Sequence, residues 1–269
     1  MPMTALTYLT SSSKKYSMKI VTGHLGSVAP GGRSVTWAAT GRFGGHSLPP
    51  FDELNLATYV GDAPGDVKRN LQVAAASIGL ASTDLVLMQG VHGAQVAVVD
   101  QGGPVSGVEP RCDALVTRTP GVGLVALAAD CVPMVLADAA NAVIGAVHCG
   151  WRGLIAGVVP AALDQMNLLG ADQVHAVIGP SICAKCYRVP SERVLELRGA
   201  LPNAISAVAC PESEVARIDV GAGVRAQLAA AGVSASKVTT LAGCTAQSRG
   251  LFSYRRDGLT GRQGMLVRL

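Results

Sequence analysis

The feature that most constrains the fold is a series of short apolar runs through the middle of the chain. They cover residues 85–88, 95–99, 114–117, 122–128, 132–137 and 142–147, and β-branched side chains are frequent in them. Runs of this length, bounded by glycine and polar residues, are typical of strands. Residues 34–39 and 173–178 have the same character, so we expect a β-rich core.

Helices are predicted between and beyond these runs. Residues 66–80 carry Val67, Leu71, Ala74 and Ile78 at intervals of three or four, which is helical spacing. Helices are also predicted over residues 156–169, 191–197 and 219–231. Because strands and helices are mixed without regular alternation, we expect an α+β fold with mixed α/β layers, in which a mixed β-sheet core is flanked by helices.

The domain organisation is predicted to be simple, because no segment has the composition of a linker and no repeat of fixed period is present. We expect a single domain over residues 19–269. Residues 1–18 are rich in Ser and Thr and lack the apolar block of a secretory signal, so we expect a disordered leader there. No apolar run reaches the roughly 20 residues that span a bilayer, and seven cysteines at irregular spacing do not suggest a disulfide framework. A cytoplasmic protein without membrane contact is therefore predicted.

Composition narrows the classes of function. Hydrophobic residues make up 49% of the chain and charged residues 15%, which excludes an intrinsically disordered protein. Aromatic residues make up 4%, which argues against a stacking platform for single-stranded nucleic acid. The net charge of +4 comes from scattered basic residues, so we expect no nucleic-acid partner. A site for a small anionic group is compatible with this charge.

Three possible metal ligands lie at breaks between the apolar runs. They are His92, Cys131 and His148, and each lies at the end of a predicted strand or in the loop beside one. Two imidazoles and one thiolate suit zinc, and three protein ligands leave a fourth tetrahedral position open for water or substrate. The same donors also bind copper.

Each of these residues also has a purely structural interpretation. A histidine taken singly is more often a structural residue than a ligand, and a cysteine between apolar runs is more often a small buried hydrophobe. The three positions are far apart and form no compact ligand motif. Residue chemistry alone therefore leaves both interpretations open.

A set of short motifs follows in a fixed order along most of the chain after about residue 38. They read TGRFGGHS (40–47), LNL (54–56), VGD (60–62), VHG (91–93), ADCVP (129–133), HCGWRG (148–153), IGPSI (178–182), CY (186–187), CT (244–245) and FSYRRDG (252–258). This order resembles the laccase-domain family, also called multicopper polyphenol oxidoreductase-like or YfiH-like proteins. A chance match of so many motifs in one order is very improbable.

The resemblance implies a YfiH-like layered domain and a zinc site whose ligands are His92, Cys131 and His148. It implies phosphorolysis of purine nucleosides, with adenosine, inosine, guanosine and methylthioadenosine as substrates, and also adenosine deamination. The small-molecule partners would then be a purine nucleoside and phosphate. The family name also suggests multicopper oxidation, but the chain has five histidines, too few for a type-1 copper and a three-copper cluster. Copper bound in vitro would be adventitious.

Four positions depart from the usual pattern of the family. Gly90 stands where a Gln usually precedes the VHG motif, and Cys149 replaces the usual Ala after the second histidine. Leu71 follows the helix Asn where an Arg is usual, and Arg188 follows the CY motif in place of a Glu. Because the three ligands are intact, these departures bear on substrate preference and not on metal binding.

Phosphorolysis would also require groups that hold an anion, a ribose and a proton. Arg42 and Arg255 are candidates for phosphate, because a guanidinium forms bidentate hydrogen bonds of fixed geometry; a surface ion pair is the alternative for each. Asn55 is a candidate for a ribose hydroxyl, although an Asn in a loop often caps its own turn. Asp130 is a candidate general acid or base, or alternatively a group that orients His148.

Two other functions remain open at this point. Cys131 as a nucleophile, with His148 or His92 as the base, would suit a cysteine hydrolase, and the resemblance connects bacterial members of the family with amide bonds of peptidoglycan precursors. Copper-dependent polyphenol oxidation is the other, and the number of histidines disfavours it.

The remaining cysteine motif is the pair Cys183 and Cys186, which has Cys-x2-Cys spacing. A structural metal at this pair would need further ligands nearby. Cys210 and Cys244 each stand alone in the sequence, so no second metal is expected here.

Overall fold

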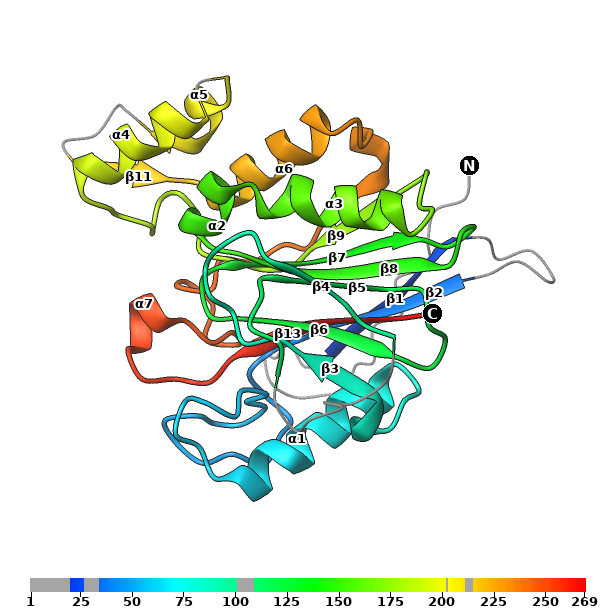
Figure 1. Ribbon diagram of the computed structural model, residues 1–269. Coiled ribbons are helices and arrows are strands. Elements are labelled where there is room, and N and C mark those ends of the chain that lie inside the picture. The colour runs from blue at the N-terminus through cyan, green and yellow to red at the C-terminus, as the bar shows by residue number, and fades with distance from the viewer. Residues whose placement is uncertain (1–19, 27–33, 101–108, 202, 211–214) are drawn as a thin grey trace.

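Two mixed β-sheets lie face to face in the centre of the computed structural model, which describes residues 20–26, 34–100, 109–201, 203–210 and 215–269 (Figure 1). The first sheet has the strand order β1 (Ile20–Gly26), β2 (Ser34–Thr40), β13 (Gln263–Arg268), β6 (Gly123–Ala128) and β3 (Leu85–Leu87). The second has the order β12 (Val238–Thr240), β9 (His175–Ile178), β7 (Val132–Asp138), β8 (Val143–Cys149), β5 (Ala114–Thr117) and β4 (Val96–Val98). The pairs β3–β6, β4–β5 and β9–β12 are parallel, and the other neighbours are antiparallel.

Helices cover the outer faces of both sheets and complete four layers (Figure 1). Helix α1 (Pro64–Ser77) lies against the first sheet, and α2 (Trp151–Ala156), α3 (Val158–Leu168) and α6 (Val220–Ala230) lie against the second. Beyond them are α4 (Ser191–Ala200), α5 (Ile205–Val208) and the hairpin of β10 (Ala209–Cys210) and β11 (Arg217–Ile218). Two 3-10 turns precede β3 and β12, at η1 (Ser82–Asp84) and η2 (Ala235–Lys237), and α7 (Tyr254–Asp257) precedes β13.

The alternation of side chains along each strand divides the core into three apolar layers. In β6, Leu124 and Ala126 point between the sheets, whereas Val125 and Leu127 pack toward α1. The central strands β6, β7 and β8 are buried along their whole length. Because both faces of these strands are covered, they are continuous apolar runs instead of alternating ones.

The predicted fold class is confirmed, because the chain forms one α+β domain with mixed sheets flanked by helices. The boundaries differ most near Gly157, whose left-handed backbone (φ 80°) separates α2 from α3. The helix predicted over residues 156–169 is therefore α3 alone, and the separate short helix α2 begins inside the HCGWRG motif (148–153). Strands β1, β12 and β13 and the hairpin of β10 and β11 were not predicted, and the predicted leader lies outside the described residues.

In the part of the chain that the structure describes, no helix is long and apolar enough to cross a membrane.

Candidate active site

Two connections and the end of one strand bring His92, Cys131 and His148 together at one end of the two sheets. His92 follows β3, Cys131 lies in the short connection between β6 and β7, and His148 lies near the end of β8. The antiparallel register of β7 and β8 pairs Pro133 with His148, so Cys131 and His148 are close to each other. One ligand atom of each of the three residues lies within 4.8 Å of the others. The geometry therefore assembles a donor set that could hold one metal ion.

Asp113 fixes the orientation of two of these residues. Its Oδ1 lies 3.0 Å from His148 Nδ1, and its carboxylate accepts the backbone N–H groups of Val91, His92 and Gly93 at 3.3, 2.9 and 2.7 Å. With Nδ1 committed to Asp113, the Nε2 atom of His148 is left for a metal. The interpretation in which Asp130 orients His148 is wrong, because Asp113 takes that place. The sequence signal was an Asp directly before a fully apolar strand.

The thiol of Cys131 lies in a positive environment. Burial acts to raise its pKa, but the charge of His148 and hydrogen bonds from His148 and His92 lower the pKa of Cys131 to about 6. Burial acts to lower the pKa of His148, whereas the Cys131 thiolate and Asp113 hold that pKa above its ordinary value. Without a metal, each of these two groups therefore favours the charged form of the other.

The backbone around the three residues has unusual conformations and a glycine at a close contact. His92 and Asp130 have φ values of 59° and 97°, in the left-handed region that residues other than glycine rarely occupy. Such conformations are concentrated at functional sites. At Gly150, a Cβ atom would lie 3.0 Å from His92 Cδ2 and 3.1 Å from Cys131 Sγ. Gly150 therefore allows the two ligands to approach each other.

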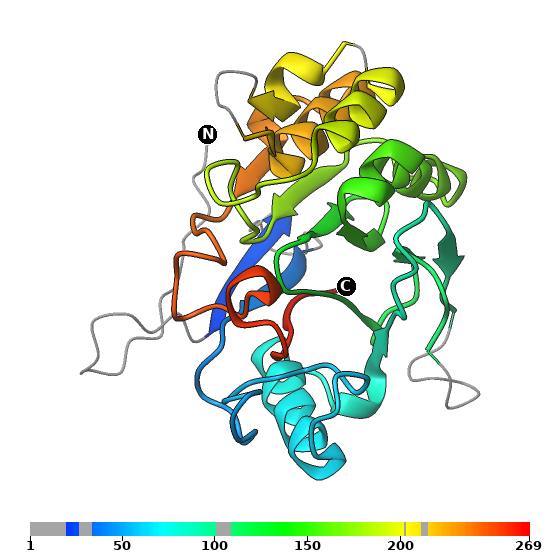
Figure 2. The ribbon, with the colours of Figure 1, turned by 90° about the vertical axis from the view of Figure 1, so that its left-hand side faces the viewer.

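A cavity of about 470 Å³ lies over the three residues. Besides His92, Cys131 and His148, its lining contains aromatic rings and cations, namely Tyr59, Trp151, Tyr187, Tyr254, Arg255 and Arg262. Tyr254 and Arg255 belong to α7, which Figure 2 shows in front between the helical layer and α1. A cavity of this size accommodates a small organic ligand.

Asp130 lies beside Cys131 and lines this cavity. Its Oδ1 accepts hydrogen bonds from the hydroxyl groups of Thr245 at 2.5 Å and Ser253 at 2.7 Å. Its Oδ2 accepts the backbone N–H of Arg255 at 2.6 Å. The carboxylate is therefore fixed by three donors, and it can exchange a proton with a ligand in the cavity.

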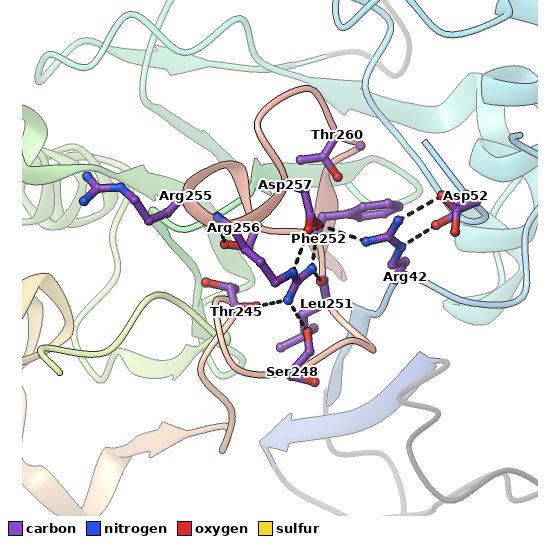
Figure 3. A network of polar contacts seen from close by, with 12 residues as sticks. Arg42, Asp52, Thr245, Ser248, Leu251, Phe252, Arg255, Arg256, Asp257 and Thr260 are labelled. Atoms are coloured by element: carbon purple, nitrogen blue, oxygen red, sulfur yellow. Dashed lines mark hydrogen bonds and ion pairs between the residues drawn. The ribbon is translucent and has the colours of Figure 1, made fainter. Parts of the chain in front are cut away.

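The structure separates the two arginines that were predicted to bind phosphate (Figure 3). Arg42 forms ion pairs with Asp52 at 2.9 Å and with Asp257 at 3.0 Å, and it lies outside the cavity lining. Arg255 points away from this ion-pair network and lines the cavity, where its guanidinium lies 5.0 Å from the centre of the Tyr187 ring. Arg42 thus forms ion pairs, as the alternative interpretation of this residue predicted.

Asn55 is fully buried and lies outside the cavity lining. Its Oδ1 accepts the backbone N–H of Ala57 at 3.0 Å and that of Arg262 at 2.9 Å, and its Nδ2 donates to Asp62 at 2.8 Å. These are the contacts of a turn cap that also holds Arg262, a cavity residue. Arg262 was not predicted as a site residue, because it lies after the FSYRRDG motif, and only its contact with Asn55 distinguishes it.

The four unusual positions have different surroundings. Gly90 lies against the site, where a Cβ would be 3.1 Å from His148 Nδ1. Cys149 is fully buried among apolar residues, and burial raises the pKa of its thiol well above the ordinary value. Leu71 packs against the apolar layer beside α1, and the Arg188 carbonyl accepts Arg255 Nη1 at 2.7 Å. Of the four, Gly90 and Arg188 therefore reach residues of the cavity.

Comparison with known proteins identifies the family. The model of the multi-copper polyphenol oxidoreductase laccase family matches residues 36–269. The chain belongs to this family. Among its relatives in the family, a purine nucleoside phosphorylase ORF3 of Streptomyces griseus is 44% identical over 87% of this chain and 94% of its own length. An adenosine deaminase RL5 from an unknown prokaryotic organism is 34% identical over 78% of this chain and 84% of its own length.

Solved structures of the family have the same fold. The YfiH protein of Bacillus licheniformis superposes with a TM-score of 0.82 at 27% identity, covering 91% of this chain and 98% of that one. YlmD of Geobacillus stearothermophilus superposes with a TM-score of 0.80 at 32% identity, covering 89% and 93%. The laccase-family chain described here therefore has a YfiH-like domain, and its relatives support an enzymatic role.

Proposed function

We propose that this chain is a zinc-dependent purine nucleoside phosphorylase, acting on adenosine, inosine, guanosine and methylthioadenosine, which also deaminates adenosine. The observation that carries the proposal is the cavity itself. It combines a three-ligand metal site, a fixed carboxylate, two arginines and several aromatic rings. The names of the relatives from Streptomyces griseus and from the unknown prokaryotic organism support both activities.

The donor set fits a catalytic zinc ion. His92, Cys131 and His148 provide two nitrogens and one sulfur, which is a zinc-type set with one position left open. Asp113 fixes the ring of His148 as a carboxylate commonly does beside a zinc ligand. Zinc bound there would supply Lewis acidity at the end of the cavity.

The position of two arginines in the cavity lining supports their assignment to phosphate. Arg255 and Arg262 both lie in the lining, and each keeps N–H groups beyond those bonded to carbonyl oxygens, since a guanidinium has five. We therefore assign the phosphate to these two residues and not to Arg42, whose charge is paired with Asp52 and Asp257. A bidentate contact from either arginine would orient a phosphate oxygen toward the sugar.

Asp130 is assigned the transfer of a proton to the purine. In phosphorolysis a phosphate oxygen bonds to C1′, the C1′–N9 bond breaks, and its electron pair goes to the purine, which takes up a proton. The products are ribose 1-phosphate and the free base. Asp130 Oδ2 accepts one backbone N–H within the described residues, so it has a lone pair free to take the proton that the attacking phosphate gives up and to pass it to the purine.

The deciding assay is phosphate-dependent release of hypoxanthine from inosine, followed by chromatography of the base and of ribose 1-phosphate. We expect no release when phosphate is absent. Release at an equal rate without phosphate would show hydrolysis and refute phosphorolysis. Ammonia release from adenosine without phosphate tests the deaminase activity separately.

Replacement of Arg255 tests the phosphate assignment. Because a hydrogen bond to a charged group contributes about 1.5–3 kcal/mol, Arg255→Met should raise the KM for phosphate by roughly tenfold or more. The matched control is Arg249→Met, which removes an exposed arginine outside the cavity lining. An unchanged KM in Arg255→Met would contradict the assignment.

A cysteine hydrolase acting on amide bonds of peptidoglycan precursors is the second candidate. The observation that favours it is the position of the Cys131 thiol beside His148 and His92. These imidazoles lower the pKa of Cys131 to about 6 against the effect of burial, and a thiolate is the nucleophilic form. Activity that survives removal of the metal but is lost on alkylation of the thiol would support this candidate over the zinc enzyme.

Multicopper oxidation is disfavoured by the distribution of histidines. In the part of the chain that the structure describes, the metal-ligand group contains two histidines, His92 and His148. His24 belongs to β1, where it contacts Thr36, and His175 begins β9. Histidines dispersed in this way do not form a cluster of several coppers.

A further inference from the structure

A second group of metal-type ligands lies outside the cavity lining. The thiols of Cys183, Cys186 and Cys244 lie within 4.8 Å of one another, and all three residues are half-buried. The sequence left Cys244 without a partner, and the structure corrects this by placing it beside the Cys-x2-Cys pair. The physical reason is a parallel bridge between Ser181 and Cys244, with Thr245 N donating to Ser181 O at 3.2 Å.

The Cys-x2-Cys segment forms a tight turn around one carbonyl group. Cys183 O accepts the backbone N–H groups of Cys186 and Tyr187, both at 3.0 Å. The N–H of Cys183 in turn points at Cys244 Sγ, 3.3 Å away. The turn therefore places two thiols on one side and directs a backbone donor at the third sulfur, which stabilises a thiolate.

A positively charged group lies near Cys244. Arg256 Nη1 donates to the carbonyl oxygen of Thr245, the residue that follows Cys244, at 2.7 Å. The Arg256 guanidinium is therefore close enough to offset part of the charge of a thiolate cluster.

We propose that Cys183, Cys186 and Cys244 form a second, thiolate zinc site in this protein. Thiolates select soft ions such as zinc, and Zn–S bonds of about 2.3 Å in a tetrahedron place the sulfurs about 3.8 Å apart. Separations of up to 4.8 Å therefore close on an ion with a small inward movement. A disulfide would use two of the thiols and leave the third unused.

The second site would connect two loops that contact residues of the cavity. Residues adjacent to the three cysteines contact the active site: Ile182 N donates to Asp130 O at 3.0 Å, Thr245 Oγ1 donates to Asp130 Oδ1, and Tyr187 lines the cavity. Zinc bound to all three thiols would thus hold Asp130 and Tyr187 in position. It takes no part in the reaction, and the proposal is independent of the assigned activity.

Cobalt titration of the metal-free Cys131→Ser protein tests the site without altering it. This variant removes the only thiol of the first site as defined by His92, Cys131 and His148. We expect about one equivalent of Co²⁺ to give the intense thiolate-to-cobalt charge-transfer absorption of a tetrahedral site, and one equivalent of zinc to remove it. Absence of this absorption in the folded, reduced variant would overturn the proposal.

Zinc analysis of reconstituted protein provides the second measurement. We expect about two zinc ions per chain in the wild type and about one in either Cys131→Ser or Cys244→Ser. The matched control is Lys185→Ala, which changes an exposed residue inside the same turn and should keep both ions. A wild type with one zinc that is unaffected by Cys244→Ser would overturn the proposal. A disulfide between two of the three cysteines would also overturn it. Mass spectrometry of the cysteine-containing peptides would show the disulfide as a loss of two hydrogens, in protein purified under reducing conditions.

Discussion

At the scale of single residues, the proposed metal centre depends on atoms that are absent as much as on those present. Gly150 has no side chain where a Cβ would touch both His92 and Cys131. Asp113 is fully buried with no lysine or arginine paired to it among the described residues, and its charge is balanced by His148 and by backbone N–H groups. The site therefore tolerates little change at either position.

Gly150→Ala should weaken zinc binding by roughly tenfold or more, because the added methyl group would push His92 and Cys131 apart. Competition with a zinc chelator measures the affinity. Gly199→Ala is the matched control, since a Cβ there meets no atom within 4 Å and the residue lies in α4. Equal zinc affinities in the two variants would show that the ligands do not require a glycine at 150.

At the scale of elements, two neighbouring arginines of α7 have different roles, one in the cavity and one in holding a loop (Figure 3). Arg255 lines the cavity. Arg256 donates to the carbonyl groups of Thr245, Ser248 and Leu251 at 2.7, 2.6 and 2.8 Å and also pairs with Asp257 at 2.7 Å. The loop that carries Thr245 is thus held by one guanidinium.

Arg256→Met should lower the free energy of unfolding by about 2–4 kcal/mol, because it leaves these carbonyl groups without their charged donor. Urea denaturation measures the change. Arg255→Met, one residue earlier, is expected to leave stability nearly unchanged while it affects phosphate. A stability loss of the same size in both variants would contradict this division.

Asp138, at the turn between β7 and β8, should make the stability of the fold depend on pH. Burial acts to raise the pKa of Asp138, but donors from Asn141, Asp172 and Gln173 lower it from the ordinary 3.8 to about 2. Because the folded-state pKa is the lower one, the carboxylate stabilises the fold above pH 3.8, and this contribution is lost as the pH falls toward 2.

Asp138→Asn should therefore cost about 2 kcal/mol at pH 7, and the difference from the wild type should shrink as the pH falls below 4. Urea denaturation of both proteins across this range, with a chelator present so that metal loss does not contribute, provides the measurement. A difference that stays constant down to pH 2 would show that Asp138 contributes no ionisation-dependent stability.

At the scale of the whole molecule, the active site belongs to no single sheet. His92 follows a strand of the first sheet, His148 lies in a strand of the second, and Cys131 lies in the connection that joins them. The face-to-face packing of the sheets sets the distance between the ligands. A metal bound to all three would consequently link the two sheets.

Zinc should raise the Tm of the Cys244→Ser protein, in which the first site alone remains of the two proposed. At free zinc 1,000-fold above Kd the stabilisation is about 4 kcal/mol, or roughly 10 °C for a chain of this size. Calorimetry with zinc and with chelator gives the shift. The double variant Cys131→Ser/Cys244→Ser should show none, and an equal shift there would place the stabilising zinc elsewhere.

Much of the architecture could be predicted from short-range patterns. The apolar runs at residues 114–117, 122–128 and 132–137 correspond closely to β5, β6 and β7, because a strand that is covered on both faces must be apolar throughout. The terminal strands β1 and β13 were missed. Strand β13 pairs with both β2 and β6, and pairing across such distances in the chain has no local signal.

The sequence by itself determined most of the core strands, because apolar runs are a property of neighbouring residues, and the order of the motifs indicated the three candidate ligands. Only the tertiary structure decided which polar groups meet. It paired Arg42 with Asp257, gave His148 its partner Asp113, and placed Cys244 beside Cys183. These pairs are separated by 215, 35 and 61 positions along the chain. Whether one of these residues is a metal ligand, part of an ion pair or a lone thiol therefore depends on contacts that form only when the sheets pack.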